Sequence, residues 1–462
     1  MSNRLISLEE GLNFDRRQVR EYSKRYVNPA LANLLGLLNF DKQYVRAQGC
    51  RVWDEDGEEY LDFLGGYGAL NLGHNHPEIH KAIEKVFGAP VLLQASLNKL
   101  TAVLAHNLAQ VAPGDLCRTF FCNSGAEAVE GALKLARIVT GRKDFIYCEG
   151  SFHGKTLGSL SVTGRKKYQD PFQPLIPGAV AIPYGDLESL ERALEKKTAA
   201  AFIVEPIQGE GGIVVPPPGY LQKAQELCHR YETLLIIDEV QTGFGRTGTL
   251  FACEAENVVP DILCLAKSLG GGIMPAGAFM TKERHWDKAY GSAETCLLHT
   301  STFGGNTIAM AAGINALKVT LEENLAGQAR EKGEYLLKKI QEVAEKSKLI
   351  REVRGRGLMI GLEFAPLSKG ILNRVTAGIL NKLGQEYLGA MVAGELNNRY
   401  RIITAYTLNN PNVIRLEPPL IVTKEELDRV VNALEEIVVR RGIAGIALNS
   451  GKTALSSLFG HR

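Results

Sequence analysis

The stretch from residue 234 to 243 reads Leu-Leu-Ile-Ile-Asp-Glu-Val-Gln-Thr-Gly, an apolar run that ends abruptly in acidic residues. Residues 199–204 and 262–266 form two similar apolar runs on either side of it. Helical periodicity separates the runs, for example over 220–231, and this alternation is typical of buried strands in a parallel sheet. We therefore predict an α/β fold whose larger domain is a doubly wound, mainly parallel sheet.

The pattern extends outward from this core and then changes. A helix is predicted over 126–140 and a strand over 144–148, whereas 49–64 suggests two short strands around Asp56-Gly57. Residues 1 to about 47 are predicted to be helical. After about residue 325, a charged helix (326–346) and strands at 358–364 and 413–420 predict a smaller α+β domain.

The predicted domain limits follow from this change. Residues 1–65 form an N-terminal segment that contributes to the small domain, 66–325 the large domain, and 326–462 the C-terminal small domain.

Composition excludes several classes of protein. The 462 residues include 53 Lys+Arg against 51 Asp+Glu, 45% hydrophobic residues and eight scattered cysteines. Balanced charge argues against nucleic-acid or membrane-surface binding. Single cysteines without Cys-x-x-Cys pairs predict reduced thiols and no metal site. With neither a signal-like N-terminus nor an apolar run long enough to span a membrane, a cytoplasmic location is expected.

Polar groups follow three of the predicted strands, where ligands of α/β sheets bind. Ser124-Gly125-Ala126 open a helix and offer N–H groups to a phosphate, although a simple N-cap would look the same. Asp238 ends one apolar run and Lys267 ends another. Burial favours the neutral, nucleophilic amine of such a lysine. A phosphate site, an acid and a Schiff-base lysine together are what pyridoxal 5′-phosphate (PLP) requires.

An ATPase is the alternative from another class, because an apolar strand ending in Asp-Glu also resembles a Walker B element. A Walker A loop would need a glycine five residues before Gly-Lys-Thr. Glu149 and Ile446 occupy those positions, so the ATPase interpretation is disfavoured.

From about residue 30 to 440 the chain resembles the class III aminotransferases of PLP fold type I. Within that family its motifs are most similar to those of putrescine aminotransferases. The stretches that match the family are 60–63 through 73–77, 123–127, 151–154, 205–212, 238–248, Lys267 with its following glycines, and 302–306. Those that match the putrescine enzymes especially well are 216–220, 251–254 and 261–267. The resemblance implies PLP as the cofactor and a homodimer with shared active sites, with a tetramer left open.

By this resemblance, two residues are catalytic. Lys267 would carry PLP through a Schiff base and move the proton between substrate Cα and cofactor C4′. Asp238 would pair with the pyridinium nitrogen and keep it protonated. The phosphate would be bound by Ser124, Gly125 and Ala126.

Four further residues are expected at the cofactor. Thr302 matches the threonine that reaches the phosphate of the neighbouring subunit, and Phe152 would stack on the ring, although a plain core aromatic is the alternative. Gln241 should hydrogen-bond near the ring hydroxyl. His153 is expected to play a supporting role.

Substrate recognition is expected from four residues. Arg415 matches the arginine that binds the α-carboxylate of 2-oxoglutarate, and Glu210 matches the gate glutamate that pairs with it; a structural salt bridge is the alternative. Lys155 stands where ornithine, acetylornithine and 4-aminobutyrate enzymes carry an arginine, which tilts the donor towards a diamine. Gln94 lies in a stretch that is expected to line the pocket of the partner subunit and to meet the distal amine there.

The predicted reaction moves the terminal amine of a diamine to 2-oxoglutarate, giving an aminoaldehyde and glutamate. Putrescine is the expected donor, with cadaverine left open. Within the family, an ornithine-, acetylornithine- or 4-aminobutyrate-type ω-transaminase is the alternative, followed by an aminomutase or racemase. Two departures bear on the donor: residues 395–406 look like an insertion before Arg415, and the tail after about residue 442 has no counterpart in the family.

Overall fold

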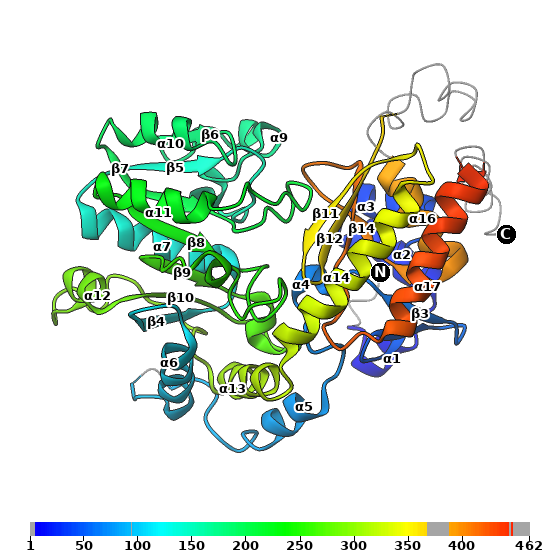
Figure 1. The fold of residues 1–462 in the computed structure, drawn as a ribbon. Coiled ribbons are helices and arrows are strands. Elements are labelled where there is room, and N and C mark those ends of the chain that lie inside the picture. Colours follow the sequence, from blue (N-terminus) through cyan, green and yellow to red (C-terminus); the bar gives the residue numbers. More distant parts are fainter. Residues whose placement is uncertain (1–4, 94, 367–387, 443–444, 447–462) are drawn as a thin grey trace.

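The apolar runs form the middle of a seven-stranded sheet in the computed structural model, which describes residues 5–93, 95–366, 388–442 and 445–446 (Figure 1). The strand order is β4-β10-β9-β8-β7-β5-β6. The strands are β4 (Leu116–Cys122), β5 (Asp144–Cys148), β6 (Ala179–Ile182), β7 (Ala199–Val204), β8 (Leu234–Asp238), β9 (Ile262–Leu265) and β10 (Gly277–Lys282). β10 is antiparallel to both neighbours, whereas β5 through β9 pair in parallel. The predicted mainly parallel sheet is confirmed.

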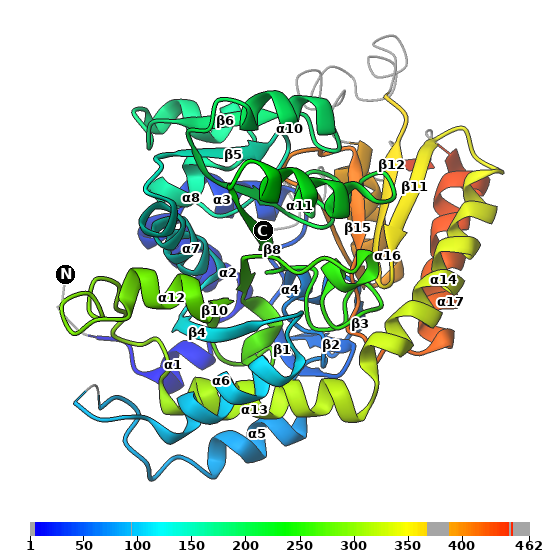
Figure 2. The ribbon, with the colours of Figure 1, turned by 60° about the vertical axis from the view of Figure 1, so that its left-hand side comes forward.

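Both faces of this sheet are buried, which explains why its strands are continuously apolar. In β8, Leu235 and Ile237 join one hydrophobic cluster, which includes α11, and Leu234 and Ile236 join the other, which includes α7. Figure 2 shows α7 and α11 on opposite sides of the sheet. The helices of this region are α5 (Pro77–Glu84), α6 (Lys99–Val111), α7 (Gly125–Thr140), α8 (Leu157–Ser161), α9 (Lys166–Gln169), α10 (Leu187–Leu194), α11 (Tyr220–Arg230), α12 (Glu283–Tyr290) and α13 (Thr307–Glu322), with short 3₁₀ turns at Asp170–Phe172, Ala252–Glu256 and Lys267–Gly270.

A smaller antiparallel sheet follows in the C-terminal part of the chain. Its order is β11-β12-β15-β14, with α14 and α17 lying side by side against it (Figure 1). The elements are α14 (Leu325–Ala344), β11 (Ile350–Arg356), β12 (Met359–Phe364), α16 (Leu388–Tyr400), β14 (Ala405–Tyr406), β15 (Val413–Leu416) and α17 (Lys424–Glu435), which continues into a π-helical turn at Glu436–Arg441. The predicted helix over 326–346 and strand over 358–364 are confirmed, whereas the strand predicted over 413–420 ends at Leu416, before Pro418-Pro419.

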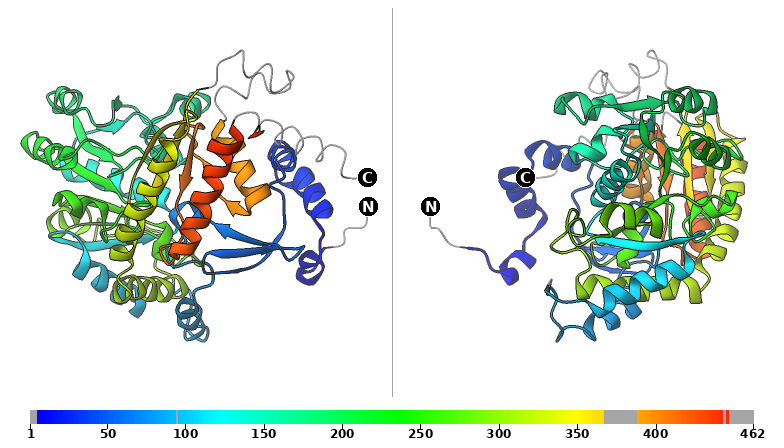
Figure 3. Two further views of the ribbon diagram at one scale, coloured as in Figure 1. Left: turned by 45° about the vertical axis from the view of Figure 1, so that its right-hand side comes forward. Right: turned by 90° about the vertical axis from the view of Figure 1, so that its left-hand side faces the viewer.

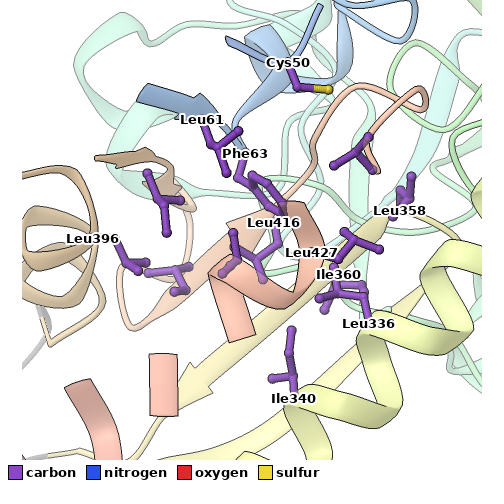
Figure 4. Close-up of a cluster of buried hydrophobic side chains, with 14 of the residues drawn as sticks. Cys50, Leu61, Phe63, Leu336, Ile340, Leu358, Ile360, Leu396, Leu416 and Leu427 are labelled. Carbon is purple, nitrogen blue, oxygen red and sulfur yellow. The ribbon is translucent and has the colours of Figure 1, made fainter. Parts of the chain in front are cut away.

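The two ends of the chain share one core. The third sheet is ordered β1-β2-β3-β13, and β13 (Ile402–Ile403) pairs in parallel with β3 (Glu59–Asp62). Figure 4 shows the buried cluster in which Leu61 and Phe63 lie near Leu416 and Leu427. The residue limits 1–65, 66–325 and 326–462 themselves stay a prediction.

The N-terminal helices α1 (Leu8–Leu12), α2 (Arg16–Tyr26) and α3 (Pro29–Leu37) lie at the periphery, away from the seven-stranded sheet (Figure 3). The prediction of helix as far as residue 47 is wrong at its end, because β1 (Tyr44–Gln48) pairs with β2 (Arg51–Asp54). A short helix, α4 (Gly65–Gly68), follows β3. Among the described helices, none is both long and apolar enough to cross a membrane.

Candidate active site

A cavity of about 620 Å³ opens at the carboxyl edge of the large sheet. Its wall includes residues that directly follow three of the strands and the last residue of a fourth, β8, which is where α/β sheets bind ligands. Of the residues predicted from the sequence, those lining it are Ser124, Gly125, Ala126, Phe152, His153, Glu210, Asp238, Gln241 and Lys267.

The first turn of α7 supplies hydrogen-bond donors to this cavity. Ser124 caps the helix by accepting a hydrogen bond from the Glu127 N–H at 3.2 Å. The N–H groups of the first turn have no partner within the helix, and the helix dipole favours an anion there. A Cβ at Gly125 would lie 2.8 Å from Val240 Cγ1, so this turn packs closely against the loop after β8. Capping and anion binding are therefore compatible at this helix.

Asp238 and His153 form a buried pair on the cavity wall. His153 Nδ1 lies 2.7 Å from Asp238 Oδ2, and the other carboxylate oxygen accepts from the Val240 N–H at 3.0 Å. The His153 side chain has no solvent exposure, and its Nε2 has no hydrogen-bond partner in the described structure. The pair fixes the Asp238 carboxylate while leaving a polar histidine atom for a bound group.

Lys267 lies two residues after the end of β9, and β9 is the neighbour of β8, which ends at Asp238. Its φ of 48° is in the left-handed region, which is unusual for a residue with a side chain and recurs at functional sites. Burial lowers the pKa of Lys267, although the carboxylates of Glu417 and Glu210 partly oppose this. A larger fraction of the amine is therefore neutral, as nucleophilic attack requires.

Glu205, which the sequence analysis did not select, is a third acid on the cavity wall. It follows β7, accepts from the Phe152 N–H at 2.9 Å and from the Gly209 N–H at 3.1 Å, and thereby fixes the backbone of Phe152. Burial, reinforced by Asp238, raises the pKa of Glu205 to about 7. The strand-end rule that selected Asp238 would have found this residue as well.

Arg415 lies behind Glu210, fully buried in β15. Its Nη2 is 2.7 Å from Glu210 Oε2, and its Nη1 is 3.2 Å from an oxygen of Glu417, a residue that the sequence analysis missed. The Tyr67 ring lies 5.1 Å from the guanidinium carbon. Although burial disfavours the charged guanidinium, the two carboxylates raise the pKa of Arg415. Burial likewise opposes the Glu210 charge, but Arg415 keeps the pKa of that carboxyl below its usual value.

Of the predicted site residues that the structure describes, three do not line the cavity: Arg415, which stands behind Glu210, and also Lys155 and Thr302. Lys155 is exposed, with its amine 4.7 Å from the Tyr168 ring centre, and Thr302 lies in an exposed turn. Gln94 lies outside the described residues. The segment 395–406 forms the end of α16 and the short strands β13 and β14, and β14 pairs with β15 at Arg415. Of the tail after residue 442, only 445 and 446 are described.

Comparison with known proteins agrees with this geometry. Residues 38–438 match the family model for the class III aminotransferases. The chain is 39% identical over 445 residues to the aminotransferase PigE of a Serratia species, a match that covers 89% of this chain and 52% of that protein. The chain thus spans about half the length of this curated relative.

Two solved structures show the likeness in three dimensions. An ornithine aminotransferase from Toxoplasma gondii is 32% identical with a TM-score of 0.81, covering 98% of this chain and 100% of that one. An amine transaminase from an uncultivated Pseudomonas species, in its PLP-bound form, is 30% identical with a TM-score of 0.77, covering 87% and 95%. The expected PLP fold type I architecture is confirmed.

The residues on the cavity wall fit PLP by their chemistry. A helix N-terminus suits the phosphate, a histidine-paired carboxylate suits the ring nitrogen, and a lysine with a lowered pKa suits the aldehyde. The buried, unpaired Nε2 of His153 is a further polar atom at the same place.

Proposed function

The chain belongs to the class III aminotransferases, whose cofactor is PLP, and from this premise we propose that it transfers the terminal amino group of a diamine to 2-oxoglutarate. Putrescine is the proposed donor, with cadaverine as the longer option. The products are an aminoaldehyde and glutamate. That the reaction consumes an amine and a keto acid follows from the family; the two particular substrates are the proposal.

The observation that carries this proposal is the charge of the cavity wall. Asp238 is assigned to the ring nitrogen and burial raises the pKa of Glu205, so Glu210 supplies the carboxylate charge for the donor. Glu210 also covers Arg415, and Lys267 is the only lysine or arginine among the described lining residues. A donor that enters while Glu210 covers Arg415 therefore meets a carboxylate instead of a guanidinium. A diamine carries only positive charge and suits such a wall better than an amino acid does.

The roles proposed for the cofactor-binding residues follow from their positions. When bound, the cofactor supplies a protonated ring nitrogen that draws electrons from the reacting carbon. The Asp238 carboxylate, oriented by His153, holds the proton on that nitrogen. Lys267 holds and returns the proton at the reacting carbon. The first turn of α7 would bind the phosphate, Phe152 would cover one face of the ring, and Gln241 would hydrogen-bond near its hydroxyl; all three line the cavity.

The keto acid is proposed to bind after Glu210 turns away from Arg415. The guanidinium can then accept a carboxylate in a bidentate manner. Thr302 is proposed to reach the phosphate in the neighbouring subunit of a homodimer, for which its exposed turn is suited. Lys155, exposed over Tyr168, leaves the distal end of the donor without a guanidinium in the described structure.

An ornithine-type ω-transaminase is the second candidate, since the similar Toxoplasma gondii structure is named an ornithine aminotransferase. An aminomutase or racemase is a third candidate and would turn over without any keto acid.

A donor panel tests the proposal. The purified holoenzyme is supplied with 2-oxoglutarate and with putrescine, cadaverine, ornithine, N-acetylornithine or 4-aminobutyrate, and glutamate is measured. We expect kcat/KM for the better diamine to exceed that for each amino acid by about tenfold or more, corresponding to about 1.4 kcal/mol. Faster turnover of ornithine or 4-aminobutyrate would overturn the diamine assignment. Product formed without keto acid would indicate an isomerase.

A further inference from the structure

Glu417 follows β15 two residues after Arg415 and is fully buried. Its N–H donates to the Phe63 carbonyl at 2.9 Å, and Leu416 beside it packs near Phe63 in the shared core (Figure 4). Arg246 donates to the carbonyl of the next residue, Pro418, at 2.5 Å. The backbone of Glu417 is therefore held on both sides.

The carboxylate of Glu417 joins two residues of the site. One oxygen accepts from Arg415 Nη1 at 3.2 Å, and Gln241 Nε2 lies 2.8 and 3.0 Å from the two oxygens. Gln241 lines the cavity, whereas Arg415 stands behind Glu210. Glu417 thus connects an amide on the cavity wall with the guanidinium behind Glu210.

The two carboxylates on Arg415 differ in their freedom to move. Glu210 lies in a turn, borders the cavity and is held by the Leu408 N–H at 2.9 Å, so its side chain can leave by rotating into the open space. Glu417 does not border the cavity and has no solvent exposure. After Glu210 turns away, Arg415 still carries one carboxylate.

We infer that Glu417 is a positioning and specificity-determining residue, which weakens the hold of Arg415 on any incoming carboxylate and keeps Gln241 in place. The inference rests on the proposed function, because it takes Arg415 as the carboxylate-binding group. A guanidinium that already has a buried carboxylate partner gains less from a second one. This weaker binding applies to amino-acid donors and to the keto acid, which carry carboxylates, but not to a diamine, which carries none. The site thereby favours carboxylate-free donors.

The environment of Lys267 is consistent with this arrangement. Burial lowers the pKa of Lys267, and Glu417 is the strongest of the charges that oppose the effect. Glu417 therefore acts on the amine as well as on Arg415 and Gln241. Replacing it should change the pH at which the visible band of the bound cofactor titrates.

The test is the affinity of the Glu417→Gln holoenzyme for glutarate, a dicarboxylate without a reacting group, by titration calorimetry. We expect the Kd to fall about five- to thirtyfold, with the pH midpoint of the visible band shifted downward, because one negative charge has left the site. The KM for 2-oxoglutarate should fall, while kcat with putrescine changes less. Unchanged or weaker glutarate binding would overturn the inference.

Two further variants make the result decisive. Glu239→Gln is the matched control: Glu239 is also fully buried and accepts from Thr242 and from the Cys253 N–H at 2.8 Å, with no contact to Arg415, so its glutarate Kd should equal that of the wild type. If Glu417→Gln does not fold, Glu417→Asp withdraws the carboxylate by one methylene and should tighten glutarate binding about two- to fivefold. No tightening in that variant would likewise overturn the role.

The calorimetric test involves no amine donor, so it separates this inference from the donor assignment. Tighter glutarate binding in the variant together with a preference for ornithine would overturn the diamine proposal and retain the role of Glu417. A preference for diamines together with unchanged glutarate binding in the variant would retain the diamine proposal and overturn the role of Glu417.

Discussion

The carboxyl edge of the large sheet and the end of β15 bring charges together in different ways. At the sheet edge, the Asp238 carboxylate pairs with His153 at 2.7 Å, and Lys267 follows the adjacent strand β9. At the end of β15, one guanidinium lies between Glu210 and Glu417. The Asp238–His153 pair holds the carboxylate in one position, whereas Glu210 can rotate away from the guanidinium of Arg415. The carboxyl edge of the large sheet, called the fixed edge below, therefore serves the chemistry common to the family. The end of β15 serves the choice of substrate.

The largest effect should come from the fixed edge. Asp238→Asn keeps the shape and a hydrogen bond to His153 but removes the charge that holds the ring proton. We expect kcat with every donor to fall about 10³-fold, because buried, preorganised charge contributes strongly to catalysis. Steady-state glutamate formation measures this. Glu239→Gln, next along the chain, removes a buried carboxylate outside the cavity and should have a far smaller effect on kcat; equal losses would mean that Asp238 acts only through folding.

A change at the end of β15 should slow the half-reaction with 2-oxoglutarate much more than the half-reaction with the amine donor. Arg415→Gln removes the guanidinium, so kcat/KM for 2-oxoglutarate should fall about 10²-fold, as expected for the loss of a charge-assisted bidentate contact. The reaction of the bound cofactor with putrescine should change less than about threefold, because that donor has no carboxylate. Stopped-flow absorbance follows each half-reaction separately. Equal losses of rate in both half-reactions would contradict the assignment of substrate choice to the end of β15.

The smallest effect concerns pH and the stability of the fixed edge. Since burial raises the pKa of Glu205 from 4.5 to about 7, the folded state binds a proton more tightly than the unfolded state. This contribution to stability is fully present below about pH 4.5 and is lost as the pH rises through about 7. Between about pH 5.5 and 8, the wild type should lose roughly 2 kcal/mol that Glu205→Gln does not lose. Urea unfolding of both holoenzymes at the two pH values measures this, and parallel pH profiles would show that Glu205 is not protonated in the folded state.

The two regions also differ in how far the sequence predicts them. Apolar runs ending in Asp238 and Lys267 predicted the large sheet and two residues of its cavity, because strand ends converge by topology. The same rule applied to Glu205 would have added a third. Glu417 could not be found in this way, because it follows an antiparallel strand. Arg415 is only two residues away, but Gln241 is 176 residues away and reaches Glu417 only through tertiary packing. β1 was missed for a similar reason: its pairing with β2 overrides the helical trend of the N-terminal segment.

The most direct test of the account is the chemical link between the cofactor and the fixed edge. The holoenzyme is treated with borohydride, digested, and its peptides are analysed by mass spectrometry. The account predicts a yellow protein that loses its visible band and carries the reduced pyridoxyl group on Lys267 alone, with no labelled peptide in Lys267→Ala. A colourless protein without PLP, or a label on another lysine, would contradict it.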